Sequence, residues 1–287
     1  MATKLMQPEA AAERDQKAGL SSGVLIGAST GPLDRPALER RDWIAGLQKG
    51  LSIIETFDYA NPRMTAAQVG ARTGLTRTAS RRHLLTLAHL GYVATDGKLF
   101  WLTPAVLRLG HSYLESSRLP RIVQPFLQRV TAGTSETAFM SVLDGGDIVY
   151  IARNGSNVYM NTGYVVGARV QAQVTSAGML LLALSDPAWL AKWFTSHQLK
   201  PYTTHTVTDP ALLRQEMAHI RAQRWCVSEQ QLELDMRGIA VPLIDLRGGL
   251  VCALNVTMPI GKESTENALR RVLPILQEIA RAMRNLI

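Results

Sequence analysis

The chain has 287 residues, of which 46% are hydrophobic and 19% charged, so it can bury one large core or two modest ones. The formal net charge is +8, and much of it is local, because residues 61–108 hold seven basic side chains and one acid, Asp96. Such a positive field attracts a polyanion, either DNA or an anionic membrane surface. The longest apolar run, 177–184, is far too short to span a bilayer, which leaves DNA as the favoured partner and argues against a membrane protein.

Residues 1–41 are rich in Ala, Glu, Arg and Gly and have no sustained periodicity, which predicts a mobile tail. Acids at positions 9, 13 and 15 interrupt the region where a secretory signal would need its apolar core. The only cysteines, Cys226 and Cys252, fall in apolar runs, which favours reduced core side chains over a disulfide. We therefore expect a cytoplasmic protein.

Three helices are predicted in the next segment. Apolar side chains from Ile44 to Ile54 recur at three- and four-residue steps and indicate an amphipathic helix that Asn61-Pro62 ends. "TAAQ" at 65–68 fits a capping box that begins a short second helix ending near Gly74. Thr76 can then cap a third helix that runs to about residue 90.

The third helix has one apolar face, which we expect to join the core, and one positively charged face. Arg77 and Arg81 lie one turn apart on the face opposite Leu84, and Arg82 lies beside them. A solvated face would mix charges of both signs, but no acid occurs between 58 and 96. Two helices joined by a tight turn, with the basic one second, are typical of a helix-turn-helix whose second helix enters the major groove.

A hairpin at 92–102, turning at Asp96-Gly97, follows where a winged helix has its wing, and Lys98 at its tip can reach a phosphate. Residues 42–103 are thus predicted to form a winged helix-turn-helix that binds double-stranded operator DNA. The candidate DNA-contacting residues are Arg63, Thr65, Thr76, Arg77, Thr78, Ser80, Arg81, Arg82, His83 and Lys98.

The pattern of elements changes in the rest of the chain. Residues 104–119 read as a linker helix, and 120–287 hold two β-hairpins, at 138–153 and 238–259. Further helices are predicted at 176–185, 186–196, 209–224 and 265–287, the last with a kink at Pro274. Hairpins flanked by helices indicate an α+β fold with an antiparallel sheet, an architecture that commonly holds a small ligand.

From Trp43 onward the sequence resembles the isocitrate-lyase-regulator (IclR) family of bacterial transcription factors. The likeness is carried by "LQKGLSIIETF", "LTRTASRRHLLTLAHLGYV", "LFWLTPAVLRLG", "GARVQAQVTSAG" and "RGIAVPLIDLRGGLVCALNVTMP". It implies an N-terminal winged helix, a C-terminal GAF-like domain that binds a small organic acid, and a homodimer or dimer of dimers. The segment "MNTGYVVGARV" further resembles the subgroup that controls β-ketoadipate-pathway genes in response to p-hydroxybenzoate or protocatechuate.

The resemblance places the ligand between the 160–180 segment and sheet residues near 228, 238 and 255. Ser228 and Gly238 stand where many members have Asp and Cys, which we expect to leave room for a ring, while Asn255 and Thr257 can still bind a carboxylate. Arg153 and Arg169 are candidate carboxylate partners, with salt bridges as the alternative for each. The full set of candidate effector-binding residues is Arg153, Met160, Tyr164, Arg169, Thr175, Ser176, Met179, Ser228, Gly238, Asn255 and Thr257.

Other functions fit less well. "VTSAG" at 174–178 resembles a nucleophile elbow around Ser176, but its first glycine is replaced by Val174 and no triad order follows. The six histidines have no metal-ligand spacing, so neither a cofactor nor a metal is expected. The remaining alternative to a ligand-responsive regulator is a DNA-binding oligomeric protein without a small-molecule effector.

Overall fold

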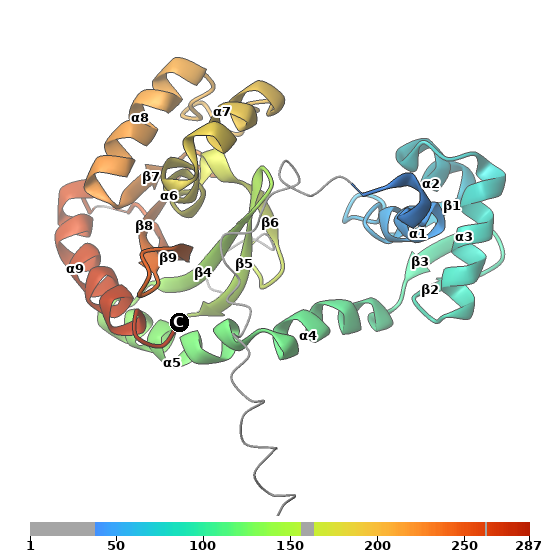
Figure 1. Cartoon of the computed structure of the whole chain (residues 1–287), viewed down its shortest axis with the longest axis horizontal. Coiled ribbons are helices and arrows are strands. Elements are labelled where there is room, and N and C mark those ends of the chain that lie inside the picture. Colours follow the sequence, from blue (N-terminus) through green and yellow to red (C-terminus); the bar gives the residue numbers. More distant parts are fainter. Residues whose placement is uncertain (1–37, 156–163, 262) are drawn as a thin grey trace, which may run out of the picture.

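The structure, a computed structural model, describes residues 38–155, 164–261 and 263–287. Most of the predicted tail, and Met160, lie outside these residues. Figure 1 shows two units joined by a helix, with α1–α3 in one unit and the large sheet in the other. The predicted α+β fold is confirmed. The order of the two units is confirmed as well, with the winged helix first and the antiparallel sheet second.

The N-terminal unit consists of three helices and a small sheet. Its elements are a 3-10 turn at Arg40–Asp42, α1 at Ala45–Ile54, α2 at Ala66–Thr73, α3 at Arg77–His89, and strands β1 at Met64–Thr65, β2 at Val93–Thr95 and β3 at Leu99–Leu102, in the order β1-β3-β2. Ile53, Val69, Leu84 and Phe100 from these elements form its buried core. The core therefore uses the apolar face of α3 and leaves Arg77 and Arg81 on the outside.

Local sequence fixes the turn between α2 and α3. Thr65 and Gln68 form the predicted capping box at the start of α2, with Gln68 N–H donating to the Thr65 hydroxyl at 3.3 Å. Gly74 ends the helix at φ 70°, a left-handed conformation that glycine adopts without strain. A Cβ atom on Gly70 would lie 2.6 Å from the Leu75 carbonyl oxygen, so the close approach of the two helices also requires glycine there.

The linker differs from the prediction. A 3-10 turn at Pro104–Val106 leads into α4 at Leu107–Ser116, and a second helix, α5, begins at Arg118 and runs to Thr134. The chain bends at Ser117, whose ψ of 122° is extended, and not at Pro120. Pro120 lies in the first turn of α5, where proline costs no helical hydrogen bond, so α5 begins before it.

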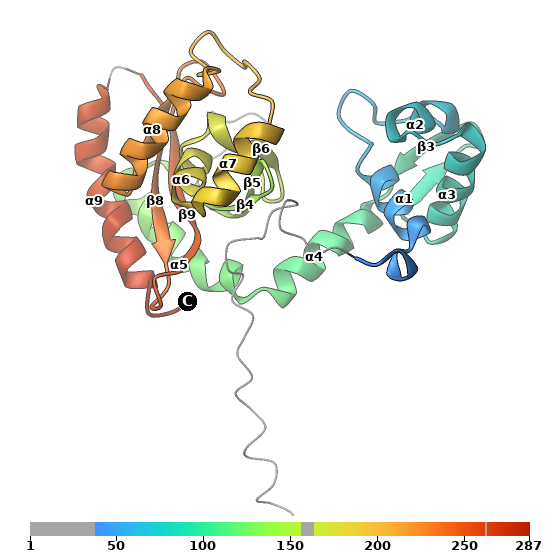
Figure 2. The same ribbon diagram turned by 45° about the horizontal axis from the view of Figure 1, so that its top comes forward.

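The C-terminal unit is built on one antiparallel sheet in the order β6-β5-β4-β9-β8-β7. Its strands are β4 at Thr137–Asp144, β5 at Asp147–Asn154, β6 at Arg169–Gln171, β7 at Cys226–Glu229, β8 at Met236–Ile244 and β9 at Leu250–Pro259. Helices α5 and α9, at Thr265–Met283, cover one face; α6 at Ser176–Leu184, α7 at Pro187–Ser196 and α8 at Pro210–Gln223 cover the other (Figure 2). Two separate apolar cores result, one on each face.

Alternation along β9 assigns each side chain to a face. Leu254 and Val256 pack in the core beneath α5 and α9, while Asn255 and Thr257 point to the face that carries α6. Cys226 and Cys252 are free and buried, one in each core, which confirms the prediction for both. Within the described residues, no helix is long and apolar enough to cross a membrane.

We predict that Gly70→Ala destabilises the α2–α3 pair by about 1–3 kcal/mol, because the added methyl must displace the Leu75 carbonyl. Hydrogen exchange at the α2 and α3 amides measures this local free energy. Gly50→Ala is the matched control, since a Cβ at that position in α1 meets nothing within 4 Å and should stabilise the helix by roughly 0.5–1 kcal/mol. Equal protection in the two variants would contradict the close-approach argument.

Candidate functional site

A basic hollow lies between α2, α3 and the β2–β3 hairpin. Arg77 and Arg81 reach it from one side of α3 and Lys98 from the hairpin, and the N-terminal residues of α2 form its floor. Asp96 is the one acid at the hairpin turn, and its carboxylate accepts the backbone N–H groups of Leu99 and Lys98, at 2.7 and 2.9 Å. These hydrogen bonds hold the pKa of Asp96 below its ordinary value. The hollow is therefore a site for an anion with several charges.

The other predicted DNA contacts of α3 and its cap differ in their exposure. Thr78 and Arg82 are exposed on the helix, and Thr76 is exposed at its cap, where its hydroxyl accepts from Ala79 N–H. His83 is partly buried. Ser80 is fully buried and its hydroxyl donates to the Thr76 carbonyl at 3.1 Å, so the prediction that Ser80 contacts DNA was wrong. Ser80 lies on the core side of the helix. It was mispredicted because a small polar residue in a sequence usually indicates a surface position.

Arg63 lies at the base of the hairpin, outside the basic hollow. Its guanidinium carbon lies 4.4 Å from the centre of the Trp101 ring, a cation–π contact that holds the side chain in place. Arg72, by contrast, is paired with Asp58. The cations of α3 and the hairpin tip, by contrast, form no ion pair with an acid among the described residues.

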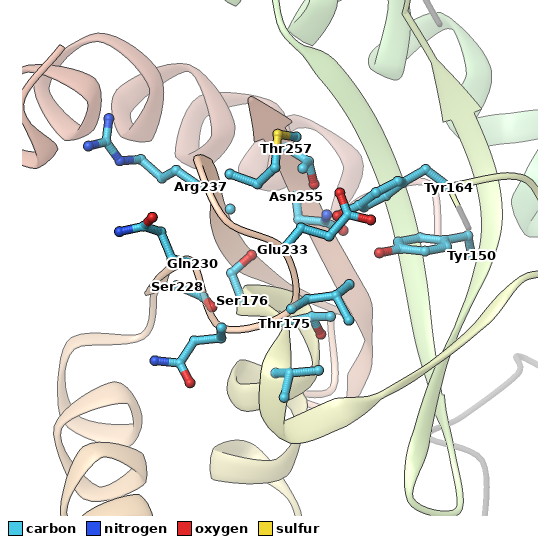
Figure 3. A pocket seen from close by; sticks show the side chains of 15 residues that line it. Tyr150, Tyr164, Thr175, Ser176, Ser228, Gln230, Glu233, Arg237, Asn255 and Thr257 are labelled. Carbon is cyan, nitrogen blue, oxygen red and sulfur yellow. The ribbon is translucent and has the colours of Figure 1, made fainter. Parts of the chain in front are cut away.

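A cavity lies in the C-terminal unit at the N-terminus of α6, between the sheet and the loop that joins β7 to β8 (Figure 3). Of the eleven predicted residues, seven line it together: Tyr164, Thr175, Ser176, Ser228, Gly238, Asn255 and Thr257. These predicted residues come from three distant segments, 164–176, 228–238 and 255–257, which the fold brings together at this cavity. The free volume is about 30 Å³, roughly enough for two water molecules.

Ser176 is the polar centre of the cavity. Thr175 caps α6 by accepting from Gly178 N–H at 3.0 Å, which presents the first turn of the helix, with Ser176, to the cavity. A helix N-terminus favours a negative charge. A Cβ atom on Gly238 would lie 2.5 Å from the Ser176 hydroxyl oxygen, so Ser176 fills the space beside Gly238. The expectation that Gly238 leaves room for a ring was therefore wrong.

Asn255 and Thr257 face Ser176 from β9. Both side chains are at least nine-tenths buried. The Asn255 carbonyl oxygen accepts the Ser141 hydroxyl at 2.8 Å, so its amide nitrogen is the atom that it can offer to a ligand. Neutral donors and a helix terminus therefore surround this end of the cavity, a set of groups that suits a carboxylate.

Aromatic rings form the opposite wall. Tyr150 and Tyr164 line the cavity, with ring centres 6.1 Å apart, and Phe139 packs behind them at 4.8 and 6.1 Å. Burial raises the pKa of both tyrosines, so each hydroxyl stays protonated and can donate a hydrogen bond. Tyr150 was not predicted, because in sequence it is one more aromatic residue in a β-rich run.

Two of the predicted ligand residues lie elsewhere, and a third lies at the margin. Arg169 binds Asp144 and Asp147, at 2.6 and 3.3 Å, at the turn of the β4–β5 hairpin, so the salt-bridge alternative is the correct one. Met179 is a buried core residue of α6 and does not line the cavity. Arg153 is on the cavity face of β5, over Phe139 at 5.8 Å, but outside the cavity lining.

The loop between β7 and β8 supplies cavity residues that sequence reasoning missed. Gln230, Gln231, Leu232 and Glu233 close the cavity on the side away from the sheet. Arg237 also borders it, but its buried guanidinium is paired with Glu229 and donates to the Glu263 carbonyl at 3.1 Å, pointing toward α9 and away from the other labelled side chains in Figure 3. A non-periodic loop carries no sequence signal for its fold, which is why these residues were not found.

Two family models together cover most of the chain. The IclR helix-turn-helix domain matches residues 46–97, and the bacterial transcriptional regulator IclR C-terminal domain matches residues 111–285. The chain belongs to the IclR family. It is a DNA-binding transcriptional regulator, and the enzyme alternative fails because the family consists of transcriptional regulators. Within the described residues, no cluster of side chains could hold a metal ion.

Relatives with known names are similar over most of this IclR-family chain. The Pca regulon regulatory protein of Pseudomonas putida is 39% identical, over 84% of this chain and 83% of its own length. The p-hydroxybenzoate hydroxylase transcriptional activator of Acinetobacter baylyi is 36% identical, over 89% and 96%. Among solved structures, the inducer-binding domain of an Acinetobacter PobR double mutant with 3-hydroxybenzoic acid is 31% identical, with a TM-score of 0.57, and covers 60% of this chain and 100% of that one. The predicted subgroup is thereby confirmed.

We predict that Arg81→Ala weakens DNA binding, because its guanidinium lies in the basic hollow and makes no core contact. If it contacts a phosphate, the loss should be similar on all sequences, and the slope of log K against log salt should fall by about 1. If it contacts guanine, about 1–3 kcal/mol should be lost at one base pair only. Fluorescence anisotropy on a labelled duplex at several salt concentrations distinguishes the two.

The control for this variant is Arg247→Ala, which removes an exposed arginine from the β8–β9 turn of the other unit. Its DNA affinity should match that of the unchanged chain. An Arg81→Ala chain that binds DNA as tightly as this control would contradict the assignment of the hollow.

Proposed function

We propose that this IclR-family regulator responds to a small aromatic acid of the p-hydroxybenzoate or protocatechuate type, bound in the cavity at the N-terminus of α6. In this proposal residues 42–103 bind operator DNA, 104–119 link the units, and 120–287 bind the effector and oligomerise. The observation that carries the proposal is the pairing, in one buried cavity, of a donor-rich end around Ser176 with an aromatic wall of Tyr150 and Tyr164.

The donor-rich end suits a carboxylate. The Ser176 hydroxyl and the Asn255 amide converge there with the first turn of α6, whose free N–H groups attract an anion. Neither Arg169 nor Arg237 presents its guanidinium to this end, because each is held by acids elsewhere. We therefore infer that the acid is bound through neutral hydrogen bonds and the helix terminus, and not through Arg169, which the sequence suggested.

The aromatic wall favours a ring over a two- or three-carbon acid. Flat rings at 6.1 Å separation give a flat ligand large contact surfaces, and the tyrosine hydroxyls can meet a ring hydroxyl. An acid as small as pyruvate would leave these surfaces without contacts. The relatives named for Pca and p-hydroxybenzoate regulation, and the PobR domain with 3-hydroxybenzoic acid, support the same chemical class.

Assembly into a homodimer or a dimer of dimers is also part of the proposal. Trp43, Ile44, Leu47 and Leu51 leave a large apolar stripe exposed along α1, and α4 exposes a second one that includes Leu107. Exposed apolar surfaces of this extent are typical of interfaces. A dimer would also present two α3 helices to two half-sites of a palindromic operator, in the cytoplasm where the DNA is.

We predict that 4-hydroxybenzoate raises the melting temperature of the chain more than pyruvate or glyoxylate does at equal concentration. Ser176→Ala should weaken 4-hydroxybenzoate binding about tenfold or more, because a hydrogen bond to a charged group is lost. Calorimetric titration measures the loss. Ser196→Ala, which removes an exposed hydroxyl from α7, is the matched control and should bind normally. A larger shift with pyruvate, or unchanged binding by Ser176→Ala, would refute this cavity as the effector site.

We also predict that Leu47→Glu shifts the assembly to the next smaller species, because it places a charge in the middle of the α1 stripe, where Leu47 is 61% exposed. Sedimentation velocity at micromolar concentration gives the mass. Leu212→Glu, at a similarly exposed leucine of α8 (56%), controls for the added charge and should leave the mass unchanged. The same mass for both variants would show that α1 is not an interface.

A further inference from the structure

Glu233, at the tip of the β7–β8 loop, places a carboxylate inside the cavity. In Figure 3 its side chain lies between Ser176 and the two tyrosines and not out in solvent. We propose that Glu233 is an internal anion that occupies the effector cavity, so that an aromatic acid binds only when the 230–235 loop withdraws this side chain. The inference rests on the proposed function, since it concerns how the same cavity admits its ligand.

The first argument is volume. The free space of about 30 Å³ admits roughly two water molecules and no benzoate ring. Most of the wall is fixed: α6 is buried from Ser176 to Ala183, and the strands behind Asn255 and Thr257 lie in the centre of the sheet. The β7–β8 loop is the part of the wall that faces solvent, with Leu234 57% exposed, so it is the part that can open.

The second argument is charge. A bound carboxylate and the Glu233 carboxylate would repel each other inside one small cavity. The negative charge of Glu233 also adds to burial in raising the pKa of Tyr150 and Tyr164, which places it within electrostatic reach of both hydroxyls.

The third argument is the way the loop is anchored. Gln231 is clamped to the segment before α8, because its carbonyl accepts the Thr206 hydroxyl at 2.7 Å and its side chain accepts Val207 N–H at 2.8 Å. Gln230 and Asp235, at the two ends of the loop, have φ values of 54° and 60°, a strained conformation for residues other than glycine. The loop is thus anchored at Gln231, and its tip, 232–234, lies between the two strained residues Gln230 and Asp235. This arrangement suits a short tip that moves as a unit.

The experiment compares Glu233→Gln with the unchanged chain, using 4-hydroxybenzoate and the uncharged 4-hydroxybenzamide as probes in calorimetric titrations. The substitution keeps the size of the side chain and removes its charge. We expect it to tighten 4-hydroxybenzoate binding about tenfold and to change 4-hydroxybenzamide binding about threefold or less. A residue that only packed against the ligand would change both affinities alike. Glu55→Gln, a charge removal at an exposed position of the N-terminal unit, should leave both unchanged.

Glu233→Ala is the second variant, and it removes volume as well as charge. It should bind both probes more tightly than the unchanged chain does. If Glu233→Gln binds 4-hydroxybenzoate no better, or more weakly, while the unchanged chain binds it, the inference is wrong and the proposed function stands. If no chain in the series binds either probe, the proposed function is wrong and the inference falls with it.

Discussion

The seating of α6 on the sheet is the contact on which the C-terminal unit depends. Every residue of this helix from Ser176 to Ala183 is buried, so it cannot shift without emptying the core. Two glycines permit the contact: a Cβ on Gly178 would lie 2.1 Å from the Ala172 carbonyl oxygen, and one on Gly238 would lie 2.5 Å from the Ser176 hydroxyl oxygen. Because the helix is fixed this closely, its N-terminus and Ser176 stand at a defined place over β8 and β9, and that place is the cavity.

Strand β5 gives the cavity a physical connection to the DNA-binding unit. Tyr150 faces the cavity, while Val149 and Ile151 border an apolar hollow whose other wall is Tyr113 and Leu114 of α4. The same helix leads through the Pro104–Val106 turn into the β2–β3 hairpin. A ligand can change the DNA affinity only by stabilising one arrangement of these elements over another. A displacement of β5 against α4 is the change that this packing would transmit.

The sequence predicted the elements whose signals are local and periodic. The capping box at Thr65, Gly74 and the Thr76 cap defined α2 and α3, and the alternation at 254–257 assigned Asn255 and Thr257 to the cavity. Features set by tertiary contacts were missed. Arg169 was taken for a ligand residue because its two acids come from a hairpin 22 and 25 residues away in the chain, and Glu233 was missed because the fold of its loop depends on Thr206 and Ile260.

The resemblance to IclR regulators supplied what periodicity could not, namely which faces of the two units carry function. It also misled where this chain departs from the common pattern. Gly238 looked like spare volume beside a ring, whereas it is the close approach that admits Ser176. A residue that is small in sequence can mark either an open space or a tight contact, and only the packing of α6 distinguishes the two cases.

The most direct test of the account is the DNA affinity of the full chain with and without saturating 4-hydroxybenzoate, at one salt concentration, on a duplex selected from a random library. The account predicts a change in Kd of about 5- to 150-fold in either direction, the usual range for coupled sites. It also predicts that Ser176→Ala loses this change at ligand concentrations that saturate the unchanged chain. A chain that binds the acid at this cavity and shows the same DNA affinity with and without it would contradict the account.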